Sequence, residues 1–537
     1  MNECVLRGIP VSPGVGIGKA FVLKERKGGF VRQKLTPEEE KKRYARAADS
    51  FGKEALANAE NIKNTVGENA AKILRSHAAL AADPYSRKSA EEYMESGMSA
   101  EETAEKVWGE WRDALKASPD RLTRERAGDA EDILKGILSA LEGNSEKEFP
   151  SGCVLVCREF TPSLAAKSRG AAAVVSKAGG VTSHGAILAC SMGIPCIMGV
   201  DTEGISDGAI VICDGRDGTV IVNPDESRIK QYETVGAAYV KQREELKKYG
   251  SMEAVTPAGK RVLVECNAGS LSDVQEALKA GGDGVGLFRT EFLFAERDKA
   301  PDAEEQYSVY KTAAQTLAGR PLTIRILDAG GDKKIPYLNF PQEENPFLGL
   351  RGIRFCLREK ELFKCQIKAI LRAGAFGDVR ILIPMVTMRE EVLSVRELIG
   401  ECRRELLLSG YTVPENIPVG VMIETPAAAV CADKLSECSD FFSVGTNDLT
   451  QYIMAADRGN KSVSYLYSPK ALPVVRAVEM TARAARKTKI PLHVCGEAAC
   501  DPEFLSLLIN ADTDAVSVSP GKVASVKYSI ITGKSPQ

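Results

Sequence analysis

Short apolar runs alternate with longer amphipathic segments throughout the second half of the chain. Each run is short enough to be one buried strand, and each following segment has apolar residues at helical spacing. The apolar runs are residues 262–266, 284–288, 322–327, 379–383, 419–423, 441–444, 492–494 and 515–518. This alternation predicts a C-terminal (β/α)8 TIM barrel over residues 256–537, whose active site would lie at the C-terminal ends of the strands.

The first half carries a different pattern, in which strand signals are interrupted by a long helical stretch. Strand-like runs with glycine and proline turns occupy residues 1–25 and return at 153–156, 171–175, 194–198 and 209–222. Between them, alanine, glutamate, lysine and leucine dominate, and apolar residues recur at helical spacing. The expected parts are an α/β domain (1–25 plus 145–223), an inserted helical bundle (36–143) and a polar helical linker (224–250). The fold class is therefore multidomain α/β.

Composition narrows the class of protein. The net charge of the 537-residue chain is −2 with 27% charged residues, which gives no basic surface of the kind that nucleic-acid binding needs. No apolar stretch is long enough to insert into a membrane, and the N-terminus lacks a signal-peptide core. Fourteen cysteines without a CxxC pair favour a reduced, cytoplasmic protein, and three histidines make a multi-histidine metal site improbable.

One histidine occupies a position where it could act as a nucleophile. The apolar run 171–175 predicts a buried strand, and Thr182 and Ser183 are good N-cap residues for a short helix over 185–192. His184 would thus lie at a helix N-terminus, where backbone N–H groups favour anions. This position suits a nucleophilic imidazole that becomes phosphorylated, although an isolated histidine near a cap is more often only structural.

Polar residues gather at the predicted C-terminal ends of the barrel strands. They are Arg289, Arg325, Lys333, Arg351, Glu424, Asn447, Asp448, Arg458 and Cys495. Arginines that converge on one mouth repel each other unless an anion lies between them, and arginine matches both phosphate and carboxylate. Two carboxylates, Glu424 and Asp448, supply the oxygen ligands that Mg²⁺ prefers. Cys495 is either a general acid in this mouth or another apolar cysteine. Together these residues predict an anion-plus-metal site.

Several long motifs then resemble one family. GGVTSHGAILA is similar to the phosphohistidine signature of the phosphoenolpyruvate-utilising enzymes. GLFRTEFLF, MIETPAAA, FSVGTNDLTQYIMAADRGN and VCGEAACD resemble barrel motifs of the enzyme I family of the bacterial sugar phosphotransferase system. The resemblance extends over nearly the whole chain, including the inserted bundle.

The resemblance implies a role for each candidate residue. His184 would take the phosphoryl group of phosphoenolpyruvate and hand it to a small carrier protein, HPr, which docks on the bundle. Substrate phosphate and carboxylate would be held by Arg289, Arg325, Asn447 and Arg458, with Arg351 and Lys333 nearby. Glu424 and Asp448 would bind Mg²⁺, and Cys495 would protonate the enolate to give pyruvate. The barrels would pair into a homodimer, and His184 would swivel about the 224–250 linker between barrel and bundle.

The chain departs from the family pattern at four positions. Cys190 stands where an arginine usually follows the histidine, and Cys500 replaces a glycine after the barrel cysteine. In the bundle, Glu131 and Gly136 occupy positions where arginines are expected, which weakens the expectation of an ordinary HPr interface.

Two other functions remain open on the sequence alone. A dikinase or synthase of the same superfamily would need a nucleotide-binding region before His184, which the sequence does not supply. A non-catalytic sensor that binds phosphoenolpyruvate would fit the altered positions, but it would not need the complete set of residues at the barrel mouth.

Overall fold

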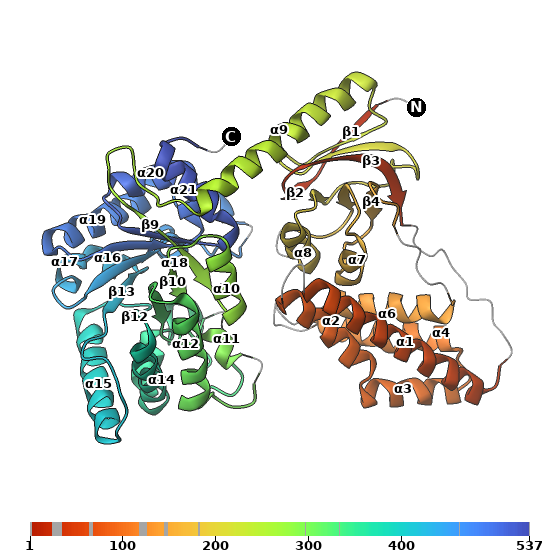
Figure 1. Ribbon diagram of the computed structural model, residues 1–537. Helices are drawn as coiled ribbons and strands as arrows, with labels where there is room; N and C mark the ends of the chain where they lie inside the picture. The colour runs from red at the N-terminus through yellow and green to blue at the C-terminus, as the bar shows by residue number, and fades with distance from the viewer. Residues whose placement is uncertain are drawn as a thin grey trace. The chain divides into compact units, whose positions relative to one another are not determined.

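The computed structural model describes residues 3–23, 35–63, 68–117, 126–143, 149–180, 183–295, 297–331, 333, 335–460 and 462–535. The chain forms two compact units, Met1–Arg243 and Glu244–Gln537 (Figure 1). Each unit has its own core, so each is described by itself.

The first unit contains an eight-stranded mixed sheet with the order β1-β8-β7-β3-β4-β5-β6-β2. Its strands are β1 (Cys4–Arg7), β2 (Ile9–Ser12), β3 (Val15–Val22), β4 (Val154–Cys157), β5 (Ala173–Ser176), β6 (Cys196–Met198), β7 (Ile210–Asp214) and β8 (Thr219–Val222). Strands β3 to β6 run parallel, while β1, β2, β7 and β8 add antiparallel pairs. Two short helices follow central strands, α7 (Pro162–Lys167) and α8 (His184–Met192). The predicted strand at 209–222 is therefore a hairpin of β7 and β8.

A helical bundle is inserted in sequence between β3 and β4 (Figure 1). Its described helices are α1 (Pro37–Lys63), α2 (Glu68–Ala81), α3 (Pro84–Glu95), α4 (Ala100–Ala117) and α6 (Ala127–Leu141). Buried side chains at helical spacing, such as Tyr44, Phe51, Trp108 and Ile133, form its core. Asp83 caps α3 by accepting a hydrogen bond from the Ser86 backbone N–H, with Pro84 at the first helical position.

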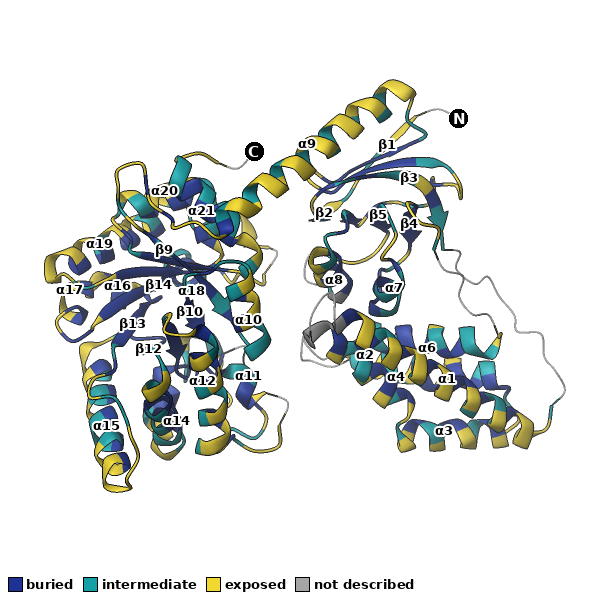
Figure 2. Cartoon of the chain, viewed as in Figure 1, coloured by how far each residue is buried: buried dark blue, intermediate teal, exposed yellow. Residues whose placement is uncertain are grey.

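The polar linker is helical, as the sequence predicts. Helix α9 spans Glu226–Gly250, all of it described, and Gly250 is its one buried residue. Figure 2 shows most of its surface exposed. A helix that is polar on all sides is typical of a connection between domains.

The second unit is a closed barrel of eight parallel strands in the order β10-β11-β12-β13-β14-β15-β16-β9. The strands are β9 (Leu263–Ala268), β10 (Val285–Phe288), β11 (Leu322–Arg325), β12 (Val379–Ile383), β13 (Val419–Ile423), β14 (Phe441–Gly445), β15 (Leu492–Cys495) and β16 (Ala515–Val518). The helices are α10 (Leu271–Lys279), α11 (Glu291–Phe294), α12 (Ala303–Leu317), α13 (Ile353–Arg358), α14 (Lys360–Ala373), α15 (Arg389–Leu408), α16 (Pro426–Val430), α17 (Ala432–Leu435), α18 (Thr446–Met454), α19 (Leu472–Thr488), α20 (Pro502–Asn510) and α21 (Val523–Thr532).

Side chains alternate along the strands between the barrel interior and the surrounding helices. On β14, Phe442 and Val444 join the large core beneath the helices, whereas Phe441 faces an interior cluster with Leu382 and Cys495. The barrel strands are mostly buried, as Figure 2 shows. The predicted fold class, an α/β domain with an inserted bundle followed by a TIM barrel, is confirmed. The exact domain limits remain a prediction.

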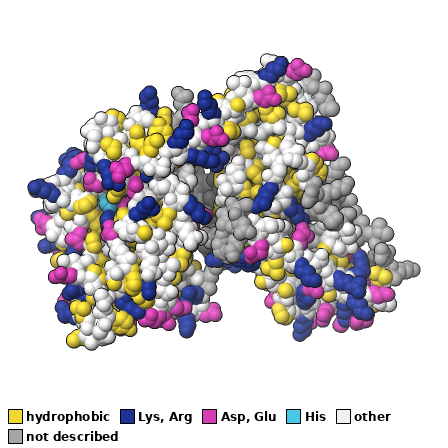
Figure 3. Space-filling view, in the orientation of Figure 1, with side chains coloured by type: hydrophobic (Ala, Val, Ile, Leu, Met, Phe, Trp, Pro, Cys, Tyr) yellow, Lys and Arg dark blue, Asp and Glu magenta, His cyan; other side chains and the backbone are white. Residues whose placement is uncertain are grey.

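Charged side chains of both signs are mixed over the face of each unit that Figure 3 shows. Among the described residues, no helix is both long enough and apolar enough to cross a membrane.

Candidate active site

His184 begins helix α8, where the chain leaves β5 through a glycine turn. Ser183 is the N-cap, and its hydroxyl accepts a hydrogen bond from the Ala186 backbone N–H over 3.3 Å. Gly193 ends the helix in the left-handed conformation. Thr182 and the side chain of His184 lie outside what the structure describes. The described backbone confirms that position 184 is at a helix N-terminus, the kind of end that stabilises negative charge.

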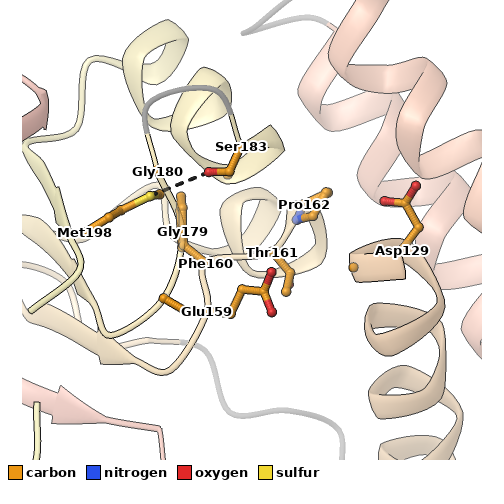
Figure 4. A pocket seen from close by; sticks show the side chains of 12 residues that line it. Asp129, Glu159, Phe160, Thr161, Pro162, Gly179, Gly180, Ser183 and Met198 are labelled. Carbon is orange, nitrogen blue, oxygen red and sulfur yellow. Dashed lines mark hydrogen bonds between the residues drawn. The ribbon is translucent and has the colours of Figure 1, made fainter. Parts of the chain in front are cut away.

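A cavity of about 180 Å³ lies beside this helix N-terminus (Figure 4). Its wall includes Ser183 and Met198 from the sheet domain, Glu159 and Thr161 from the turn into α7, and Asp129 from α6 of the bundle. The cavity is therefore shared by the sheet domain and the bundle, which belong to the same unit.

Close backbone packing sets the direction of α8. A side chain at Gly185 would place its Cβ 1.8 Å from the carbonyl oxygen of Phe160. Only glycine allows this approach, so Gly185 holds the start of α8 against the segment that carries Glu159 and Thr161.

The departures in the bundle have a packing explanation. A Cβ at Gly136 would lie 2.2 Å from the ring of Phe51, so the aromatic ring occupies the space that an arginine side chain would need. Glu131 pairs with Arg112 across 3.2 Å, between helices α6 and α4. Gly136 is thus adapted to the packing of this bundle, and Glu131 to an ion pair between two of its helices. Cys190 is an exposed residue of α8, and its Sγ lies 3.0 Å from the carbonyl oxygen of Val11.

At the barrel mouth, Asp328 lies at the centre of a cluster of cations. It accepts a hydrogen bond from Lys333 over 2.6 Å and two from the Arg351 guanidinium, each over 3.0 Å. Arg325 lies 3.4 Å away and also pairs with Glu291. Although burial opposes its ionisation, Lys333, Arg325 and Arg351 hold the pKa of Asp328 well below its usual range. The side chains of Arg325 and Arg351 are only 5% and 1% exposed, so their carboxylate partners are what make their burial tolerable.

The cluster extends to the predicted metal ligands. Arg351 donates to Asp448 over 3.1 Å and to the hydroxyl of Tyr452 over 3.2 Å. Glu424 is fully buried and accepts a hydrogen bond from the Met385 backbone N–H over 2.7 Å. Burial first, and then the charges of Asp448 and Asp328, raise the pKa of Glu424 to about 8. A divalent cation between Glu424 and Asp448 would relieve this repulsion, so the two carboxylates fit a metal. Within the described part of the chain, no group of three or more His, Cys, Asp or Glu could hold a metal ion by itself.

Cys495 ends β15 inside the barrel. The Ser443 hydroxyl donates to its sulfur over 3.4 Å, and the thiol lies 3.5 Å from the carbonyl oxygen of Val444. Burial raises the pKa of Cys495 to about 11, and the nearby charges of Glu424, Arg325 and Arg289 also act on it. The thiol therefore carries its proton at neutral pH, as a general acid must.

The remaining predicted residues, Arg289, Asn447 and Arg458, follow strand ends at the same end of the barrel. Arg289 is exposed directly after β10, and its backbone N–H donates to the Ala268 carbonyl over 2.9 Å. Asn447 lies in the first turn of α18, and its carbonyl accepts a hydrogen bond from the Tyr467 hydroxyl. Arg458 is exposed beyond α18.

The acidic partners Glu291 and Asp328, and Ser443, were not among the predicted site residues. Glu291 and Asp328 each follow a strand end that carries an arginine, and this adjacency was a usable signal. Ser443 had no such signal, because its contact with Cys495 depends on the register of β14 against β15.

Comparison with known proteins shows the class of enzymes to which the chain is similar. Three family models of phosphoenolpyruvate-utilising enzymes match the chain in order: the N-terminal domain at residues 7–126, the mobile domain at 149–218 and the PEP-binding domain at 243–534. The last of these coincides with the barrel unit, and the mobile domain contains His184.

Curated relatives narrow the class to one family. Three relatives named phosphoenolpyruvate-protein phosphotransferase come from Priestia megaterium (36% identical, covering 98% of this chain and 93% of the relative), Listeria innocua (36%, 96% and 92%) and Bacillus subtilis (34%, 98% and 94%). The chain belongs to the phosphoenolpyruvate-protein phosphotransferase family.

Proposed function

We propose that this protein transfers the phosphoryl group of phosphoenolpyruvate to His184 and then to a histidine of a small HPr-like carrier, with release of pyruvate. This would be the first step of sugar uptake by a phosphotransferase system. The observation that supports the proposal most is the cluster at the barrel mouth, because buried cations, two carboxylates and a protonated thiol lie together at the C-terminal ends of the strands.

The first half-reaction needs charge neutralisation and positioning more than covalent help from the barrel. Arg289, Arg325, Asn447 and Arg458 bind the substrate phosphate and carboxylate, with Arg351 and Lys333 fixed around Asp328 to support them. Glu424 and Asp448 would hold Mg²⁺, which would supply positive charge to the anionic substrate when it is bound.

In this reaction His184 is the nucleophile and Cys495 is the acid. The His184 imidazole attacks phosphorus, so an N–P bond forms while the bond from phosphorus to the enol oxygen breaks. Cys495 then gives its proton to the methylene carbon of the enolate, which forms a C–H bond and leaves a thiolate. The products are phosphorylated His184 and pyruvate.

The second half-reaction takes place away from the barrel. We propose that the carrier docks on the helical bundle and that α9 is the hinge about which His184 moves between its two partners. The cavity beside the N-terminus of α8, bordered by Asp129 of the bundle, supports a carrier site at this position. We further propose a cytoplasmic homodimer that pairs through the barrels.

Labelled substrate tests the proposal. The protein is incubated with [³²P]phosphoenolpyruvate and Mg²⁺ in the absence of nucleotide, alongside His184→Ala. Acid-labile, base-stable label on the wild type alone is the expected result, and its loss on adding EDTA would support the metal role. Absence of label on both proteins would overturn the proposal and favour a sensor.

A further inference from the structure

Two ionisable side chains meet inside the barrel, beneath the proposed active site. Glu265 on β9 is fully buried, and both of its carboxylate oxygens lack a hydrogen-bond partner. His493 on β15 is 5% exposed, and its Nδ1 also has no hydrogen-bond partner. His493 Nδ1 lies 3.8 Å from Glu265 Oε2, too long for a hydrogen bond but within reach of a small shift of either side chain.

The residues around Glu265 and His493 leave space for both side chains. A Cβ at Gly286 would lie 2.4 Å from Glu265 Oε2, so the absence of a side chain on β10 accommodates the carboxylate. The ring of Phe441 lies 5.3 Å from that of His493 and covers it with apolar surface. A carboxyl group and an imidazole without full hydrogen bonding are costly in such a core, which makes the pair a poor choice for stability alone.

The pair is connected to Cys495 by strand geometry. His493 and Cys495 are two residues apart on β15, so both point into the barrel. Ser443 on β14 is the register partner of His493, and its hydroxyl donates to the sulfur of Cys495 over 3.4 Å. Glu265, His493, Ser443 and Cys495 therefore lie on three strands of the barrel interior, with Ser443 beside His493 in register.

We propose that Glu265 and His493 return a proton to Cys495 through Ser443 after each protonation of the enolate. The proposal rests on the proposed function, since it needs Cys495 to act as the acid. Ser443 breaks its O–H bond as the thiolate sulfur forms S–H. The serine oxygen takes a proton from one nitrogen of neutral His493, whose other nitrogen takes the proton of the Glu265 carboxyl group. Glu265 is left as a carboxylate and regains its proton from water.

The pKa values of these groups favour proton transfer from Glu265 towards the Cys495 thiolate. Burial raises the pKa of Glu265 to about 7 and that of the Cys495 thiol to about 11. Burial lowers the pKa of His493 to about 4, so the imidazole stays neutral and relays a proton by exchanging one N–H for the other. The charged groups that bear on the pair are Arg380, Asp378, Asp283 and Asp514. Arg380 and Asp378 pair with each other over 2.6 Å and are partly exposed.

Isotope exchange in D₂O tests the relay without a carrier protein. The full-length enzyme is mixed with phosphoenolpyruvate, Mg²⁺ and carbon-labelled pyruvate, and two rates are measured. Entry of carbon label into phosphoenolpyruvate needs only reversible phosphoryl transfer, because the thiolate can take its proton back from pyruvate. Entry of deuterium at the methyl carbon of pyruvate needs the Cys495 thiolate to take a deuteron from solvent.

In Glu265→Gln and His493→Gln, we expect the ratio of deuterium entry to carbon entry to fall at least about fivefold below that of the wild type. Thr323→Val is the matched control, because it removes a buried, unpartnered hydroxyl from a residue that is not one of the four in the relay, and its ratio should match the wild type. An unchanged ratio in both relay variants would overturn the inference, whether or not both rates fall together. Failure of the proposed function is distinguishable, because wild-type protein would then move no carbon label.

Discussion

Replacing Glu265 by glutamine should make the barrel more stable at high pH. A carboxyl group whose pKa is about 7 when folded and 4.5 when unfolded binds its proton more tightly in the folded state. Between these two values the folded protein carries more protons than the unfolded chain, so stability falls as pH rises. The difference of 2.5 pKa units corresponds to a cost of about 3 kcal/mol above pH 7.

The expected result is therefore a gain in stability that depends on pH. Relative to the wild type, Glu265→Gln should gain about 3 kcal/mol in the free energy of unfolding at pH 8 but less than about 1 kcal/mol at pH 5. Any constant cost of burying the amide cancels in the comparison of the two pH values. The opposing titration of His493, whose lowered pKa destabilises the fold as pH falls below 6.5, is present in both proteins.

Urea unfolding at the two pH values measures this gain. Circular dichroism should follow the transition, because both tryptophans, Trp108 and Trp111, lie in α4 and report on the bundle. Thr323→Val removes no titratable group and should show the same difference from the wild type at both pH values. A Glu265→Gln gain that does not change with pH would refute the assignment of a raised pKa. A stable glutamine variant would also show that its loss of deuterium exchange does not come from misfolding.

Three further predictions concern the rest of the chain. Asp328→Asn leaves two buried arginines short of a counter-charge and should lower the unfolding free energy of the barrel unit by about 3–5 kcal/mol; a loss below about 1 kcal/mol in urea unfolding would contradict this. Cys495→Ala should slow pyruvate formation about 10²- to 10⁴-fold while binding of phosphoenolpyruvate changes little, whereas Cys500→Ala should leave both near wild type; equal losses in rate and affinity would remove the acid role. Gly136→Arg should destabilise the bundle by at least about 1–3 kcal/mol, because the arginine collides with Phe51, and an unchanged midpoint in tryptophan fluorescence would contradict this packing.

Most of the architecture could be predicted from the apolar pattern. Strand β10 (Val285–Phe288) falls within the predicted run at 284–288, because a strand buried on both faces is apolar at every position. The hairpin of β7 and β8 was missed, although its turn contains two Asp-Gly pairs ending at Gly215 and Gly218. Gly218 has a φ of +80°, so the turn signal was present within an otherwise continuous apolar run.

The location of the site residues could be predicted from the sequence, but the contacts that they make with one another could not. Residues at the ends of parallel barrel strands must converge, so their proximity follows from the fold. That Asp328 would hold three cations depends on loop paths that no local pattern encodes. Glu265 and His493 are brought together only when the barrel closes, and the usable signal was a charged residue within an apolar strand, VLVECNA.

Rapid-quench analysis of a single turnover tests the central claim most directly. Enzyme, Mg²⁺ and labelled phosphoenolpyruvate are mixed, and phosphate on the protein and free pyruvate are measured at each time, with the label located by peptide mapping. We predict that one phosphoryl group appears on His184 for each pyruvate formed, with the same rate constant. Pyruvate that forms at the wild-type rate in His184→Ala, or label that maps to another residue, would contradict the account.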